Sequence, residues 1–137
     1  MYITQQQLIE RFGEAELIQL TDRDGTAGEI VTSVLDSAID DAGSEVDAYV
    51  GVRYDLPLAI VPISLVRVAS DIVRYRLYDD AATEQVRTRY EDAIKFLVGV
   101  AKGAISVGEL PEELASSGDV RMESGGRVFS RADKSFL

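Results

Sequence analysis

Apolar residues recur at every third or fourth position across residues 28–50, and this spacing constrains the fold more than any other feature. A helix with 3.6 residues per turn brings such positions onto one side, so the stretch predicts an amphipathic helix of roughly 34 Å. Gly51 stands where it can cap the end of that helix. The inward positions are Val31, Val34, Leu35, Ala38, Ile39, Ala42, Val46, Tyr49 and Val50.

Three further helical stretches accompany this one. Thr4 and Gln7 have the spacing of a capping box and open a short helix, which Gly13 interrupts before a further turn or two over residues 14–20. Pro62 can serve as the first residue of a helix to about residue 77, which is apolar on more than one side and is therefore expected to lie centrally. The last stretch covers residues 83–101. The sequence thus predicts an all-α fold with four main helices.

The domain organisation follows from where the helical pattern ends. Residues 1–108 form the expected helical domain, and residues 109–137 form an extended carboxyl-terminal tail that is too polar to build its own core. The Ser124-Gly125-Gly126 segment can turn, so the tail could form a β-hairpin. We interpret the tail as a docking segment.

The residue types available for chemistry are few. The 137 residues include no cysteine and no histidine, so thiolate and imidazole ligands and the usual nucleophile–base pairs are lacking. The three lysines are scattered and adjoin no glycine-rich nucleophile turn. We therefore expect neither an enzyme nor a bound cofactor or metal.

The charge is concentrated in the first part of the chain. Residues 1–51 hold eleven acids and two bases, and the net charge of the whole chain is −10. Such a surface repels nucleic-acid phosphates, so tight DNA or RNA binding is not expected. Neither a signal peptide nor an apolar run approaching eighteen residues is present, so no membrane association is expected and the protein should be made in the cytoplasm.

Two groups of acids need an interpretation. The loop with Asp22, Asp24, Gly25 and Glu29 resembles a calcium loop, but its glycine is at the fourth position instead of the sixth, which favours an ordinary turn. The second group could be metal ligands, a solvated helix face, or the lining of a passage to which DNA must not adhere. A solvated face is the simplest interpretation, and the channel lining is kept as a hypothesis. These candidate channel-facing acids are Asp36, Asp40, Asp41, Glu45 and Asp47.

Arginines and tyrosines alternate along residues 67–78. The side chains of such a stripe could stack on the bases of a single-stranded nucleic acid. An interface with another protein explains it more simply, because interfaces are rich in Arg and Tyr and because Arg67 and Asp71 have the spacing of an intrahelical pair. The candidate interface residues, including those of the tail, are Arg67, Arg74, Arg76, Tyr78, Arg127, Val128, Phe129 and Arg131.

Several short segments, in this order and spacing, carry a likeness to a known family. They are Met1-Tyr2, Leu8-Ile9-Glu10-Arg11-Phe12-Gly13, Glu16-Leu17-Ile18-Gln19-Leu20-Thr21-Asp22, Asp47-Ala48-Tyr49, Arg53-Tyr54, Leu56-Pro57-Leu58, Pro62, Leu65-Val66, Asp71-Ile72, Arg74-Tyr75-Arg76-Leu77-Tyr78-Asp79, Arg89-Tyr90-Glu91-Asp92-Ala93 and Arg127-Val128-Phe129-Ser130-Arg131. With them the chain resembles, nearly end to end, a Mu-like phage and prophage structural family that is itself similar to the head-tail connector proteins of tailed phages.

The resemblance implies a helical adaptor subunit without a catalytic motif. Such subunits assemble into a ring beneath the portal, usually matching its twelvefold symmetry, and the ring joins head to tail and continues the DNA channel. The implied partners are further copies of the chain, the portal protein and a tail-completion protein, and the implied location is the neck of the virion after assembly in the host cytoplasm. Two alternatives stay open: another neck or tail-completion protein of the virion, or a non-viral helical protein-binding adaptor.

Overall fold

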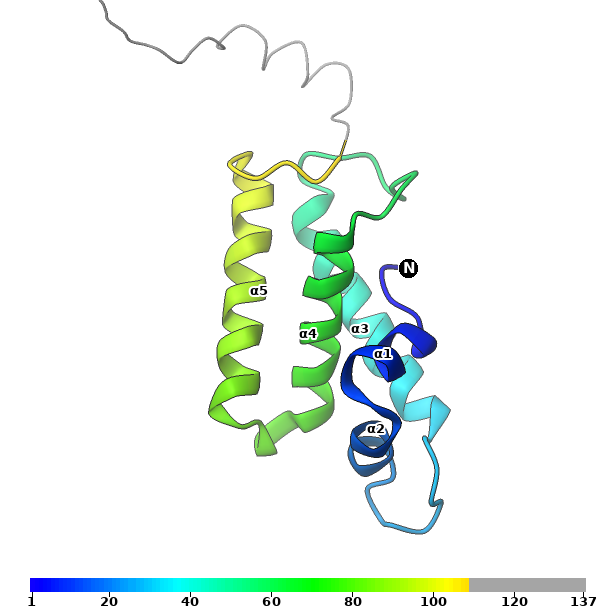
Figure 1. The fold of residues 1–137 in the computed structure, drawn as a ribbon. Helices are drawn as coiled ribbons and strands as arrows, with labels where there is room; N and C mark the ends of the chain where they lie inside the picture. The colour runs from blue at the N-terminus through cyan, green and yellow to red at the C-terminus, as the bar shows by residue number, and fades with distance from the viewer. Residues whose placement is uncertain (109–137) are drawn as a thin grey trace, which may run out of the picture.

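The computed structural model describes residues 1–108, and they form the predicted all-α fold (Figure 1). No strand occurs within these residues. The predictions of a docking tail and of a hairpin concern residues 109–137 and lie outside the described part. The elements are α1 (Gln5–Phe12), α2 (Glu14–Thr21), α3 (Thr32–Val50), α4 (Ile63–Tyr78), a 3₁₀ turn (Asp79–Ala81) and α5 (Glu84–Lys102).

Helix α4 is the centre of the bundle, as its apolar sequence predicts. It packs against α3, α5 and α2, and Figure 1 shows α3, α4 and α5 side by side. Helix α1 packs on α2, and α2 in turn contacts α3 and α4. Each large aliphatic side chain that becomes fully buried contributes about 1.5–3 kcal/mol, so this helix carries much of the stabilising burial. The buried apolar residues of α4 are Leu65, Val66, Val68, Ala69, Ile72, Val73 and Leu77.

The amino-terminal helices begin and end as the sequence predicts. The Thr4 hydroxyl accepts a hydrogen bond from the backbone N–H of Gln7, and the Gln7 side chain accepts one from the backbone N–H of Thr4. Gly13 then separates α1 from α2 with φ at +91°, a conformation that glycine adopts without strain. The predicted first stretch is thus two helices that meet at a glycine.

Helix α3 begins at Thr32, four residues later than expected from its apolar pattern. The Asp22 carboxylate accepts hydrogen bonds from the backbone N–H groups of Ala27 and Gly28, and Gly28 has φ at +67°. The Thr21 hydroxyl also accepts from the backbone N–H of Val31. Residues 22–31 therefore form a loop that folds back on the end of α2, because side chains there offer the backbone partners that a helix would otherwise supply.

Helices α4 and α5 differ from prediction only at their ends. Pro62 precedes α4 in an extended conformation instead of being its first residue, and Thr83 caps α5 by accepting from the backbone N–H of Val86. After α5 the chain turns back, and the backbone N–H of Val107 donates to the Tyr54 hydroxyl at 3.0 Å. The described chain thus ends beside the loop that connects α3 to α4.

Candidate interaction surfaces

The four interface residues predicted on α4 point to different neighbours. Arg67 and Arg74 lie on the side of α1 and α2, whereas Arg76 faces α3. Tyr78 lies near Arg74, whose guanidinium carbon is 5.9 Å from the centre of the Tyr78 ring. A helix rotates by about 100° per residue, so positions 67 and 74 share a side that position 76 does not.

Arg74 is paired inside the chain. Its Nε and terminal nitrogen donate to the two carboxylate oxygens of Glu16 on α2 at 2.7 and 3.0 Å, which is a bidentate pair. The side chains are 16% and 22% exposed, and the guanidinium lies 4.6 Å from the centre of the Phe12 ring. The hydrogen bond to Glu16 raises the pKa of Arg74 above its ordinary value. This pair fastens α2 to α4.

Arg76 belongs to a second internal network, on the opposite side of α4. Its terminal nitrogen donates to Glu45 at 2.7 Å, and the Tyr90 hydroxyl donates to the other oxygen of the same carboxylate at 2.7 Å. The Tyr90 ring stacks on Tyr75 with centroids 4.0 Å apart. Burial and then the bond to Glu45 raise the pKa of Tyr90 to about 12. Residues of α3, α4 and α5 are thereby joined through one carboxylate.

The acids predicted to face a channel divide into two groups on α3. Glu45 is engaged with Arg76 and Tyr90, and Asp41 lies on the same side of the helix, lining a hollow together with Arg76. Asp36, Asp40 and Asp47 are exposed on the other side, where positions four and eleven residues apart align. We call these three residues the α3 acidic strip. Whether they line a DNA channel stays a prediction.

One member of the strip also positions the amino terminus. The Tyr2 hydroxyl donates a hydrogen bond to the Asp47 carboxylate, and the Tyr2 and Ile3 side chains are buried. Burial, reinforced by the bond to Asp47, raises the pKa of Tyr2. The first residues of the chain are therefore held against α3.

A hollow of about 360 Å³ between α1, α4 and α5 gathers arginines from all three helices. Arg11, Arg67 and Arg89 are exposed around it, and Asp71, only 8% exposed, lines it from α4. We call it the arginine hollow. Its other lining residues are Phe12, Ser70 and Asp92.

Asp71 has no direct partner among the described residues. No donor in residues 1–108 hydrogen-bonds to its carboxylate, and no arginine nitrogen of these residues lies within 4.0 Å of it. Burial raises the pKa of the Asp71 carboxyl, and the positive charges of Arg89, Arg67, Arg74 and Arg11 offset part of that effect. The predicted intrahelical pair between Arg67 and Asp71 is thus wrong, because Asp71 faces the packed side of α4 whereas Arg67 extends outward near the Phe96 ring.

Sequence reasoning found only part of the arginine hollow. The stripe on residues 67–78 indicated Arg67, but Arg11 and Arg89 come from distant parts of the sequence, and only the packing of α1 and α5 on α4 brings them together. The candidate residues Arg127, Val128, Phe129 and Arg131 lie outside the described part of the chain.

A group of exposed apolar side chains lies around the connection from α3 to α4. Met1, Val52, Leu56, Ile60 and Ile63 are exposed, and Met1 and Leu56 line one shallow hollow of about 310 Å³. The end of the described chain is attached to the same connection through Val107 and Tyr54. The last described residues therefore lie at this connection.

Within residues 1–108 no three potential ligand side chains come together in a way that could hold a metal ion. None of the helices described is both long and apolar enough to cross a bilayer.

Comparison with known proteins connects the chain to one family. The model of the family described as "Bacteriophage Mu, Gp36" matches residues 2–124. The chain is 38% identical over 140 residues to the "Mu-like prophage FluMu protein gp36" of Haemophilus influenzae strain Rd, covering all of this chain and 99% of that protein. It is 31% identical over 139 residues to "Gene product J" of Escherichia phage Mu, with 99% of both chains covered.

Proposed function

The chain belongs to the bacteriophage Mu Gp36 family, and from this premise we propose that it is a head-tail connector subunit. Copies of it form a ring beneath the portal, and the ring joins the head to the tail and continues the DNA channel. Its partners are other copies of itself, the portal protein and a tail-completion protein. It acts in the neck of the virion, in a ring that matches the twelvefold portal, after assembly in the host cytoplasm.

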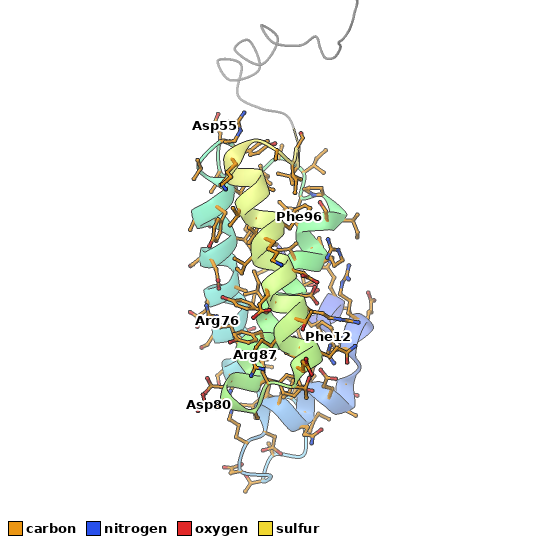
Figure 2. The ribbon with its side chains drawn as sticks, turned by 90° about the vertical axis from the view of Figure 1, so that its left-hand side faces the viewer. Phe12, Asp55, Arg76, Asp80, Arg87 and Phe96 are labelled. Atoms are coloured by element: carbon orange, nitrogen blue, oxygen red, sulfur yellow. The ribbon has the colours of Figure 1, made fainter. Side chains whose placement is uncertain are left out.

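The observation that carries this proposal is the presence of two unlike charged surfaces on one small domain. The arginine hollow lies between α1, α4 and α5, and the α3 acidic strip lies on a helix at the other side of the bundle. In Figure 2, α3 and α1 stand at opposite sides of the molecule with α5 between them. A ring is built from contacts between two different patches of each subunit, so this arrangement suits ring formation.

The proposal also accords with the overall charge. A connector has to let DNA pass without holding it, and a net charge of −10 disfavours contact with phosphates. We therefore expect neither catalysis nor tight duplex binding from the ring.

Imaging of the purified protein tests the proposal directly. Negative-stain electron microscopy and light scattering on the full chain, alone and mixed with portal protein, should show closed rings or rings stacked on the portal. A monomer at high concentration that also fails to migrate with the portal would contradict the proposal.

A different virion position is the second candidate, since the family is a phage family but the names of its members specify no position in the virion. Labelled antibody against this chain should mark the junction of head and tail in intact particles. A label at another part of the neck or at the tail would favour a tail-completion role. Membership in a phage family leaves the non-viral adaptor without support.

A further inference from the structure

We propose that the arginine hollow is the socket for a carboxylate from the α3 acidic strip of a second copy of this chain. This inference rests on the proposed function, because it identifies the contact that repeats around the ring. It concerns which two surfaces meet, and the ring could exist without this particular contact.

The walls of the hollow are supplied by three packed helices. Arg11 is on α1, Arg67 and Asp71 are on α4, and Arg89 is on α5. Small-molecule pockets in proteins measure roughly 300–1,000 Å³, so the volume of about 360 Å³ is enough to receive a side chain. A charged side chain that enters would be within reach of guanidinium groups from more than one helix.

Asp71 marks the hollow as more than a group of surface arginines. A carboxylate that is 8% exposed and has no direct donor among the described residues is costly to bury, and nearby positive charge is what makes it tolerable. In return Asp71 attracts the surrounding arginines, which would otherwise repel one another. It therefore helps to keep the guanidinium groups together without occupying their hydrogen-bonding positions.

The charges around the hollow fit one incoming carboxylate. Three arginines and the two carboxylates Asp71 and Asp92 leave the hollow with a single positive charge. Arg74, the fourth arginine nearby, is already paired with Glu16. Guanidinium groups bind carboxylates in a bidentate manner, so one acidic side chain between Arg67 and Arg89 would neutralise the hollow and use donors that have no side-chain partner within residues 1–108.

The α3 acidic strip is the occupant that fits best, and a strip carboxylate seated in the hollow would face a neighbouring subunit instead of the DNA channel. Asp36 and Asp40 are exposed one helical turn apart, and neither is in an ion pair within residues 1–108. The hollow is lined by residues of α1, α4 and α5, whereas the strip lies on α3, so the two are separate surfaces of one subunit and can meet between two subunits. A contact between unlike patches leaves one of each free at the ends of a growing row, which continues until the ring closes.

Paired charge reversals test the contact. The first variant carries Arg67→Glu and Arg89→Glu, and the second carries Asp36→Lys and Asp40→Lys. Each alone should raise the protein concentration needed for assembly by more than about tenfold, because like charges would then face each other across the contact. An equimolar mixture of the two variants should assemble again, because each reversed patch finds its opposite on the other variant.

Two matched variants control for total charge. Arg87→Glu with Lys95→Glu changes the net charge by the same amount as the first variant at exposed positions of α5 that do not line the hollow. Glu14→Lys with Glu91→Lys changes the net charge by the same amount as the Asp36→Lys and Asp40→Lys variant, also at exposed positions. Both should assemble like the wild type, and circular dichroism of all four variants should report the same helix content.

The outcomes separate this inference from the proposed function. If the wild type assembles and the first variant assembles equally well, the hollow is not the contact and the connector proposal stands. The same conclusion follows if both variants fail and their mixture fails too, or if the first variant loses only its binding to portal. If the wild type forms no ring, alone or on the portal, the proposed function fails and this inference fails with it.

Discussion

Two arginines on the same helix, two turns apart, have opposite surroundings. Arg74 is held by both oxygens of Glu16 and is mostly buried, whereas Arg67 is exposed beside a carboxylate that it does not contact. The same contrast separates the whole network around Glu45 from the arginine hollow. Charges that are paired inside the chain stabilise the fold, and charges that the fold leaves unpaired are available for contacts with other molecules. The comparison predicts that changes at the two places will affect different properties.

Removing Arg74 should produce the largest change in stability. In Arg74→Ala the Glu16 carboxylate, whose side chain is 22% exposed, loses its bidentate partner. We expect the free energy of unfolding to fall by about 2 kcal/mol, between the values for exposed and fully buried pairs. Urea denaturation followed by circular dichroism measures it.

The matched variant is Arg67→Ala, which also removes an arginine from α4 but breaks no ion pair within residues 1–108. Its free energy of unfolding should stay within about 0.5 kcal/mol of the wild type. Equal losses in the two variants would show that the distinction between paired and unpaired arginines has no energetic basis.

Removing the Tyr90 hydroxyl should have a smaller effect. Tyr90→Phe keeps the ring that stacks on Tyr75 but removes the hydrogen bond to Glu45, so we expect a loss of about 1 kcal/mol at neutral pH. The folded pKa of about 12 is above the ordinary value of 10.0, so this stability is present below pH 10 and is lost as the pH rises toward 12. The free energy of unfolding, measured from pH 8 to 11, should therefore fall less steeply with pH in Tyr90→Phe than in the wild type. Parallel curves would mean that Tyr90 does not titrate differently in the folded protein.

The fold was predictable because it depends on local patterns. The apolar spacing on residues 28–50, the capping box at Thr4 and Gln7 and the break at Gly13 are local features of the sequence, and the structure confirms the helices that they predict. The predicted start of α3 was four residues too early, because the side chains of Thr21 and Asp22 bind the backbone of the loop that precedes the helix. An apolar pattern cannot report such competing polar partners.

The candidate surfaces were less predictable because they depend on how helices pack. The spacing of Arg67 and Asp71 suggested a pair, but it cannot show that Asp71 faces inward. Likewise, the sequence shows Glu45 only as one of five acids on a helix, and the structure is needed to show that Arg76 and Tyr90 donate hydrogen bonds to it. Contacts between residues 31 to 58 positions apart carry these arrangements, and no periodicity within a single helix encodes them.

Replacing Asp71 should change the free energy of unfolding less than the Arg74 and Tyr90 variants do, and should raise it instead of lowering it. Burial raises the pKa of the Asp71 carboxyl despite the four arginines near it, so the charged form is less favourable in the folded protein than in the unfolded chain. Asp71→Asn keeps the shape without the charge and should raise the free energy of unfolding at pH 7 by less than about 1 kcal/mol. The folded wild type binds its proton more readily than the unfolded chain, so its stability rises as the pH falls through the range between the two pKa values. The advantage of the variant should therefore shrink between pH 7 and pH 4, as thermal unfolding of both proteins would measure. A loss of stability in Asp71→Asn comparable to that in Arg74→Ala would instead mean that Asp71 is paired like Glu16, and the contrast between the two arginine sites would disappear.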